Sequence, residues 1–258
     1  MENSSDQTIV VTGSSGGIGC SVVESFLKGD RFTVIGIDKK AAVQKKFSKE
    51  KYRHLAADIT NEDEIRTACA EIRDLTPPAH AILVAGGALP AEIRDKGKEP
   101  DPLDLDLDLF RKSIDINLTG QYICIKHLVP LLMSADASDR SITLVSSINS
   151  VGDFGYPAYS AAKAGLAGLT KSLAVPLGRL KIRINAVALG TVKTDYARQI
   201  HEDDDSHFGR LVNLAPLERV STIDEAALIL VTLTKLSSVT GTIITADCGQ
   251  AVPGNHDR

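Results

Sequence analysis

The sequence predicts an α/β protein whose seven-stranded, mainly parallel sheet is doubly wound, with helices on both faces. Short runs rich in β-branched residues alternate with longer helical patterns along the whole chain. A glycine-rich turn follows the first of these runs, and no repeat or low-complexity linker divides the 258 residues. We therefore expect a single domain that spans residues 1–258.

The expected strands are apolar runs without polar alternation, as in a sheet whose two faces are both covered by helices. They are Thr8–Val11, Thr33–Ile37, Arg53–Ala56, Ala81–Val84, Ser141–Val145, Arg183–Val187 and Thr242–Thr245. Helices are expected between them at Gly17–Lys28, Ala41–Phe47, Glu62–Asp74, Leu107–Leu132, Ala158–Leu177 and Ile223–Lys235. Pro176 should bend the Ala158–Leu177 helix or end it early, because proline removes a helical hydrogen bond.

Two long segments, Gly86–Asp106 and Gly190–Pro216, interrupt this alternation, and each follows an expected strand. Ligands of open α/β sheets bind outside the carboxyl ends of the strands, so both segments should border a ligand site. We expect residues 190–216 to form the substrate loop. The acidic run Glu202–Asp205 within it is expected to be a solvated surface rather than a cation site.

Composition excludes several classes of partner. The formal net charge is −4 and the basic residues are scattered, which argues against nucleic-acid binding. The four cysteines stand far apart without a CxxC pair, so we expect no metal site, no disulfide framework and a reducing, cytoplasmic location. The N-terminus is polar, and no apolar run approaches the roughly 20 residues of a membrane span.

The turn Thr12–Gly19, with the sequence TGSSGGIG, connects the first strand to the first helix. Glycines allow the backbone to turn tightly and to approach a pyrophosphate, and the helix N-terminus offers free N–H groups to its oxygens. Alone, such a turn could be a plain strand-to-helix connection. Its place at the first βα junction, with Asp38 at the end of the second strand, favours a dinucleotide site of the Rossmann type.

The Asp38 carboxylate could accept hydrogen bonds from the adenosine ribose and would repel a 2′-phosphate. Gly16 agrees, because it places no cation beside the ribose. We therefore expect NAD as cofactor and NADP only as a lesser alternative, which Lys39 keeps open. Asp58 and Ile59 follow the third strand and could contact the adenine, although Asp58 could equally take part in the start of the next helix.

Tyr159 and Lys163 lie four residues apart on an expected helix and project from one face. A phenol has a pKa near 10, so acid–base work near neutral pH requires lowering that pKa by about 3 units. An ammonium about 5 Å away at an effective dielectric near 20 contributes on the order of 3 kcal/mol, and a positively charged nicotinamide ring would add more, so that together the two charges are sufficient. Alone, however, a tyrosine four residues before a lysine is a common surface pair.

With these motifs together, the sequence resembles the short-chain dehydrogenase/reductase family, in the branch with a TGxxxGxG turn, from Thr8 to Gly249. The YxxxK motif of the family corresponds to Tyr159 and Lys163. Its catalytic serine corresponds to Ser146 or Ser147, and its helix asparagine to Asn117.

The resemblance implies that Tyr159 exchanges a proton with the substrate oxygen while hydride passes to or from a nicotinamide. Lys163 would lower the pKa of the tyrosine and hold the nicotinamide ribose, while Ser147 stabilises the substrate oxygen and Asn117 anchors a water-linked proton path. We prefer Ser147 to Ser146, because side-chain alternation after the buried Val145 and the usual pattern of the family both favour the second serine.

The resemblance also implies which residues bind the cofactor, including a segment after the sixth strand that wraps the nicotinamide. They are Gly13, Ser15, Gly17, Ile18, Gly19, Asp38, Asp58, Ile59, Ala85, Gly86, Tyr159, Lys163, Gly190, Val192 and Thr194. The sequence departs from the family pattern at Val84, Leu189 and Cys248, where asparagine, proline and glycine are common.

The expected function is hydride transfer between a nicotinamide cofactor and a small polar or cyclic secondary alcohol or ketone. Two alternatives stay open: an NADP-dependent 3-oxoacyl-thioester reductase, and a dinucleotide-sensing protein without turnover. The family often forms tetramers through the helix that carries the tyrosine, so we expect a homo-oligomer, a tetramer or a dimer. The small residues of that helix could instead serve packing on its own sheet.

Overall fold

The sheet of the computed structural model contains seven strands, and every pairing between them is parallel. The structure describes residues 7–29, 31–40, 47, 50–93, 101, 103–151, 156–200 and 205–252. The strand order is β3-β2-β1-β4-β5-β6-β7. The strands are β1 (Gln7–Thr12), β2 (Phe32–Asp38), β3 (Tyr52–Ala56), β4 (Pro78–Leu83), β5 (Arg140–Ser147), β6 (Ile182–Leu189) and β7 (Ile243–Ala246). The predicted fold class is confirmed.

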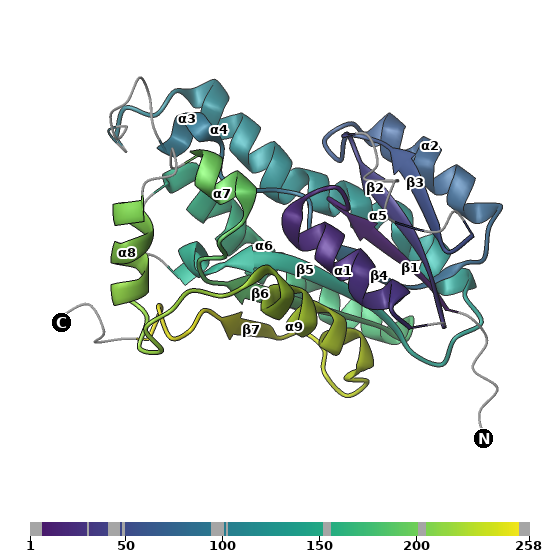
Figure 1. Ribbon diagram of the computed structural model, residues 1–258. Coiled ribbons are helices and arrows are strands. Elements are labelled where there is room, and N and C mark those ends of the chain that lie inside the picture. The colour runs from purple at the N-terminus through teal and green to yellow at the C-terminus, as the bar shows by residue number, and fades with distance from the viewer. Residues whose placement is uncertain are drawn as a thin grey trace.

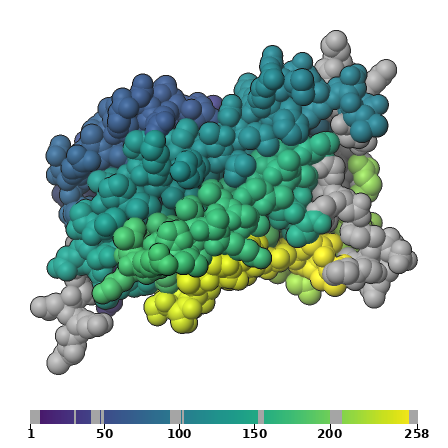
Figure 2. Space-filling model, turned by 180° about the vertical axis from the view of Figure 1, so that it is seen from behind, coloured from purple at the N-terminus to yellow at the C-terminus, as the bar shows by residue number. Residues whose placement is uncertain are grey.

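Helices cover both faces of this sheet (Figure 1). Helices α1 and α9 pack on one face, and α2, α5 and α6 pack on the other, where α5 and α6 run side by side (Figure 2). The α-helices are α1 (Gly17–Leu27), α2 (Glu62–Arg73), α3 (Pro90–Ile93), α4 (Leu107–Ile114), α5 (Gly120–Ser134), α6 (Pro157–Arg179), α7 (Asp195–Ile200), α8 (Asp205–Asn213) and α9 (Ile223–Lys235). The described residues also contain two short helical elements, the π-helical turn η2 (Asp115–Thr119) and the 3₁₀ turn η3 (Ile148–Val151).

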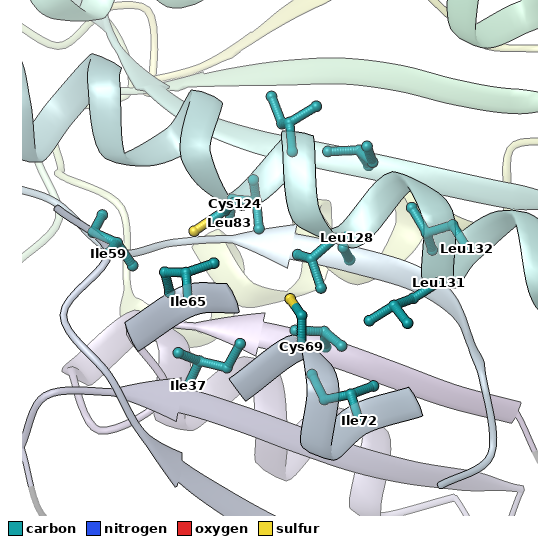
Figure 3. Close-up of a cluster of buried hydrophobic side chains, with 14 of the residues drawn as sticks. Ile37, Ile59, Ile65, Cys69, Ile72, Leu83, Cys124, Leu128, Leu131 and Leu132 are labelled. Carbon is teal, nitrogen blue, oxygen red and sulfur yellow. The ribbon is translucent and has the colours of Figure 1, made fainter. Parts of the chain in front are cut away.

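A hydrophobic cluster lies on each face of the sheet. Figure 3 shows part of one cluster, in which Ile65, Cys69 and Ile72 of α2 face Cys124 and Leu128 of α5. Burial raises the pKa of the Cys69 thiol to about 11, so this thiol stays protonated at neutral pH. All four cysteines of the chain are free thiols. The two hydrophobic clusters hold the helices against both faces of the sheet and so fix the carboxyl ends of the strands.

Three expectations about helices differ from the structure, and a fourth lies almost wholly outside the described residues. The predicted helix Leu107–Leu132 is divided by η2, where the side chain of Asn117 hydrogen-bonds outside its own turn. The α6 helix continues to Arg179, so the early stop expected at Pro176 does not occur. The predicted substrate loop 190–216 contains α7 and α8. The helix expected at 41–47 falls almost wholly outside the described residues, as do residues 202–204 of the acidic run.

The order of the strands creates a switch point. The chain moves from β1 outward to β3 and then returns to β4 on the other side of β1, so the turns after β1 and β4 lie side by side. Helices α3, α7 and α8 gather at this end of the sheet (Figure 1). Within the described part of the chain, no helix combines the length and the apolar character that crossing a membrane requires.

Candidate active site

The turn after β1 packs directly against the chain that leaves β4. Gly13 has a φ of +69°, and a Cβ there would lie 2.7 Å from the main-chain nitrogen of Ala85. Helix α1 returns so closely that a Cβ on Gly19 would lie 2.0 Å from the carbonyl oxygen of Gly13. These two positions therefore require glycine, one for its backbone conformation and both for the space.

Helix α1 begins at this turn without a side-chain cap. Its N-cap residue is Gly16, and no acidic side chain lies in its first turn. The first-turn residues Gly17, Ile18 and Gly19 line a pocket of about 550 Å³ at the switch point. The positive end of the helix dipole and uncapped N–H groups thus face a pocket, an arrangement that fits phosphate oxygens.

Asp38 lies at the end of β2 beside the glycine turn and also lines the pocket. Its Oδ2 accepts a hydrogen bond from the N–H of Ser15 at 3.0 Å, and its Oδ1 accepts one from the N–H of Lys40 at 2.9 Å. Lys39 pairs with Asp58, with 3.5 Å between Nζ and Oδ2. Of the two lysines after Asp38, one therefore already has a carboxylate partner.

The carboxyl end of β3 brings Asp58 and Ile59 to the pocket wall. Asp58 Oδ1 accepts hydrogen bonds from the N–H of Thr60 at 2.9 Å and from its hydroxyl at 2.8 Å. The N-cap of α2 is Asn61, whose side chain accepts from the first turn of the helix. Asp58 therefore shapes the turn before α2 and does not itself cap the helix.

Tyr159 and Lys163 of α6 and Ser147 at the end of β5 line the same pocket as the glycine turn. Lys163 Nζ lies 5.4 Å from the centroid of the Tyr159 ring and donates a hydrogen bond to the carbonyl oxygen of Val145 at 2.9 Å. Three predicted catalytic side chains, from the elements β5 and α6, are thus brought together in one pocket.

The two candidate serines have different surroundings. Ser146 is 2% exposed, and its Oγ donates to the carbonyl oxygen of Lys163 at 3.0 Å, so its hydroxyl joins β5 to α6. Ser147 donates to Oδ1 of Asn149 at 2.9 Å, and its side chain also makes a hydrogen bond with Tyr159. The hydroxyl with access to the tyrosine is that of Ser147.

Asn117 is fully buried in η2 and lies behind the pocket wall. Its Oδ1 accepts from the N–H of Gly87 at 2.8 Å, and its Nδ2 donates to the carbonyl oxygens of Gly87 at 3.0 Å and Ser113 at 3.1 Å. Nearby, Gln121 of α5 donates to the carbonyl oxygen of Ala85. Both amides hold the chain after β4, which forms one side of the pocket.

The pKa of Tyr159 is shifted in the direction opposite to the one that the sequence analysis predicts. Burial raises the pKa of Tyr159 to about 12, because the hydrogen bond with Ser147 lowers it less than burial and the nearby Glu92 carboxylate raise it. Burial lowers the pKa of Lys163 to about 8. In the chain without cofactor, burial therefore raises the pKa of the phenol, and the lowering of that pKa by Lys163 stays a prediction.

The chain after β6 supplies the remaining wall. Gly190, Val192 and Thr194, which were predicted to bind the cofactor, line the pocket. Tyr196 at the start of α7 also lines it, and its hydroxyl donates to the carbonyl oxygen of Ala88 at 2.6 Å. This contact joins α7 to the chain after β4 across the mouth of the site.

Several pocket residues were not predicted from the sequence. Leu89, Ile93, Asn149, Tyr156 and Tyr196 all line it. The first two lie in the segment 86–106, whose length marked it as a ligand-site border, but no single side chain there carries a recognisable motif. At the family departure Cys248, φ is +57°, which explains why glycine is common at that position.

Comparisons with known proteins agree with this geometry. The sequence model described as enoyl-(acyl carrier protein) reductase matches residues 13–251. The chain is 28% identical over 256 residues to 2,5-dichloro-2,5-cyclohexadiene-1,4-diol dehydrogenase from Sphingobium indicum, which covers 96% of this chain and 98% of that protein. It is 31% identical over 254 residues to cis-4-hydroxycyclohexanecarboxylate dehydrogenase from Sinomonas cyclohexanicum, which covers 95% and 96% respectively.

Among solved structures, a short chain dehydrogenase family protein from Francisella tularensis superposes with a TM-score of 0.82 at 28% sequence identity. The superposition covers 95% of this chain and 98% of that chain. The chain therefore belongs to the short-chain dehydrogenase/reductase family, and it is an NAD(P)-dependent oxidoreductase that acts on alcohol or ketone substrates.

Proposed function

We propose that this protein is an NAD-dependent dehydrogenase that interconverts a small cyclic secondary alcohol and its ketone. The observation that carries the proposal is that Tyr159 and Ser147 line the same pocket as the glycine turn and Asp38. A hydride donor or acceptor can therefore act on the carbon of one substrate carbonyl or alcohol group while an acid–base group acts on its oxygen. Leu89 and Ile93 give the pocket an apolar wall, which suits a ring-shaped substrate.

The residues present fit a dinucleotide at the switch point. The uncapped start of α1 would hold the pyrophosphate, and the Asp38 carboxylate would accept hydrogen bonds from the adenosine ribose. The nicotinamide, when bound, supplies or accepts the hydride. Val192 and Thr194 would contact its carboxamide, and Lys163 its ribose.

In the proposed reaction, Tyr159 Oη takes the proton of the alcohol during oxidation or returns it to the ketone during reduction. The Ser147 hydroxyl holds the substrate oxygen, and Lys163 supplies positive charge beside the phenol. Asn117 fixes the chain at Gly87, so that this side of the pocket keeps its shape. We retain the prediction that Asn117 also anchors a water-linked proton path.

A substrate panel tests the reaction. Cyclic alcohols, linear polyols and their ketones are supplied with NAD⁺ or NADH, and turnover is followed by nicotinamide absorbance. We expect turnover of at least one cyclic secondary alcohol, and its loss by about 10²-fold or more in Tyr159→Phe with NADH affinity retained. Full turnover by Tyr159→Phe would refute the role of the phenol. Dinucleotide binding without any turnover on the panel would favour the sensing alternative.

Cofactor preference rests on Asp38. The carboxylate lies beside the glycine turn, and the neighbouring Lys39 is paired with Asp58, which leaves one fewer cation for a 2′-phosphate. We expect a higher kcat/KM with NAD(H) than with NADP(H), and a shift toward NADP(H) in Asp38→Ser. A tenfold preference of the unaltered enzyme for NADPH would contradict the assignment.

The second candidate is an NADP-dependent 3-oxoacyl-thioester reductase. The match to a family described by acyl-carrier-protein chemistry favours it. A β-ketoacyl thioester assayed with NADPH separates the two candidates, because the proposed cyclic-alcohol dehydrogenase should reduce it poorly.

The remaining proposals concern the whole molecule. We propose that the chain acts as a single domain in a reducing cytoplasm, which its four free thiols support. We also propose a homo-oligomer, a tetramer or a dimer, in which the outer face of α6 packs on a second copy. Light scattering tests the assembly, and a purely monomeric enzyme at assay concentration would count against it.

A further inference from the structure

Helix α3 carries a buried carboxylate that the proposed reaction does not use. Glu92 is 4% exposed, although it lies in a four-residue helix at the end of the sheet that holds the site. Its Oε2 accepts a hydrogen bond from the N–H of Leu89 at 2.7 Å. Its Oε1 accepts one from the N–H of Tyr159 at 3.1 Å. Residue 92 thus contacts the main chain of the acid–base residue from a distant part of the sequence.

The start of α6 explains this contact. The N-cap residue Tyr156 has a left-handed conformation, with φ of +53°, and its side chain does not cap the helix. Pro157 follows at the first helical position and has no N–H. Tyr159 is the third residue of the helix, where an N–H has no partner within the helix. Glu92 supplies that partner and places a negative charge at the positive end of α6.

Glu92 also belongs to a segment that holds the other parts of the site. In the same segment, Gly87 is fixed by Asn117, and the carbonyl oxygen of Ala88 accepts from the hydroxyl of Tyr196. The segment 87–93 therefore links η2, α6 and α7. Its last residue, Ile93, lines the pocket.

We propose that Glu92 is a positioning residue for Tyr159: its carboxylate caps α6 from a remote turn and fixes the tyrosine against the substrate wall at Leu89 and Ile93. The inference rests on the proposed function, because it assumes that Tyr159 is the acid–base group. A buried carboxylate with two main-chain donors is held rigidly, and a rigid partner keeps the phenol at a constant distance from the substrate oxygen.

The charge of Glu92 has a second effect. Burial is the largest cause that raises the pKa of Tyr159 and that of Tyr196, and the charge of Glu92 raises both pKa values further. In the described part of the chain, the titratable groups around this carboxylate are Tyr159 of α6 and Tyr196 of α7, and Lys163 lies beyond the Tyr159 ring. Removing the charge should therefore move the tyrosine limb of the pH–rate profile to lower pH.

Two variants at Glu92 separate position from charge. Glu92→Ala removes both acceptors and should lower kcat at least about tenfold, while NADH affinity changes by less than about threefold. Glu92→Gln keeps one acceptor without the charge, so it should retain most of kcat and shift the tyrosine limb to lower pH. The matched control is Glu225→Ala, which removes a capping carboxylate from α9, outside the pocket lining.

The controls decide between positioning and folding. If Glu92→Ala loses no more activity than Glu225→Ala at equal loss of thermal stability, or if Glu92→Gln leaves the pH profile unmoved, the proposal is overturned. Failure of the proposed function is distinguishable, because the phenolate of Tyr159 can be titrated by ultraviolet difference spectra against Tyr159→Phe without any substrate. In that measurement the phenolate should form at lower pH in Glu92→Gln, and an unchanged titration would also refute the inference.

Discussion

Replacing Lys163 by methionine should make the protein more stable while abolishing its turnover. Lys163 is 2% exposed, and burial lowers its pKa from the ordinary 10.5 to about 8. That difference corresponds to roughly 3 kcal/mol of destabilisation whenever the amine is charged in both the folded and unfolded states. Methionine has a similar shape without the charge, but it loses the hydrogen bond to Val145, which contributes about 1 kcal/mol.

The expected net gain is about 2 kcal/mol, or a rise in Tm of roughly 4–8 °C for a chain of this size. The gain depends on pH in a defined direction. Below about pH 8 the folded lysine is charged and the full gain is present. As pH rises from there toward 10.5, the folded wild-type protein loses this proton before the unfolded chain does, so the gain disappears.

Thermal unfolding of cofactor-free wild type and Lys163→Met between neutral and alkaline pH measures this effect. The matched control is Lys171→Met on the exposed face of the same helix, which should change stability by less than about 0.5 kcal/mol at any pH. If Lys163→Met is no more stable than wild type at neutral pH, Lys163 is not a desolvated cation in the free enzyme and the reasoning fails.

Two further variants test the walls of the pocket. Gly19→Ala should lose about 2–3 kcal/mol of stability and bind NADH at least about tenfold more weakly, because its Cβ would meet the carbonyl oxygen of Gly13 at 2.0 Å. The added Cβ of its control, Gly178→Ala, meets nothing within 4 Å, so this variant should gain up to about 1 kcal/mol; urea titrations measure the stability of both variants. Tyr196→Phe loses the hydrogen bond to Ala88 and should raise the substrate KM about fivefold with little change in kcat. An unchanged KM would show that this contact between α7 and the chain after β4 does not support substrate binding.

The sheet could be predicted from the sequence because its strands are buried on both faces and therefore contain continuous apolar runs. The largest error in a strand start is at β4, which begins at Pro78 rather than Ala81. Its first residues include His80, a polar side chain that is buried here because Ser141 lies 2.9 Å from its Nδ1. Burial lowers the pKa of His80 to about 4, so it is neutral at neutral pH. Such a pairing depends on the neighbouring strand and leaves no local pattern.

The helices were less predictable where side chains bond to distant segments. The apolar periodicity of Leu107–Leu132 continues through η2, but Asn117 turns its amide toward Gly87, thirty residues away, and the π-helical turn accompanies this contact. Pro176 shows the reverse case. It lies exposed in the last turns of α6, where a carbonyl that loses its helical partner can be solvated, so the helix continues.

The motif residues of the site could be predicted because glycine-rich turns and the Tyr159–Lys163 spacing are local. Glu92 could not be, because nothing in the sequence says that a carboxylate in a proline-rich segment meets the start of α6. The same limit explains the error in the tyrosine pKa. Spacing along a helix predicts a favourable charge near the phenol, but only the folded chain shows how far both groups are removed from water.

That desolvation has a consequence for when the site becomes reactive. With a tyrosine pKa of about 12 and a lysine pKa of about 8, the free protein holds its phenol protonated and about half of its amine charged near pH 8. Acid–base work near neutral pH requires lowering the tyrosine pKa by several units, or roughly 5–7 kcal/mol. Within the described pocket Lys163 is close enough to contribute, but Glu92 opposes it.

Positive charge brought into the pocket by the dinucleotide would act on both Tyr159 and Lys163, so dinucleotide binding should be coupled to proton release from Tyr159. Calorimetric titration of NAD⁺ in buffers of different ionisation enthalpy, carried out on wild type and on Tyr159→Phe, would separate that proton from any released by Lys163. An equal buffer dependence in the two proteins would show that the phenol is not acidified at this step.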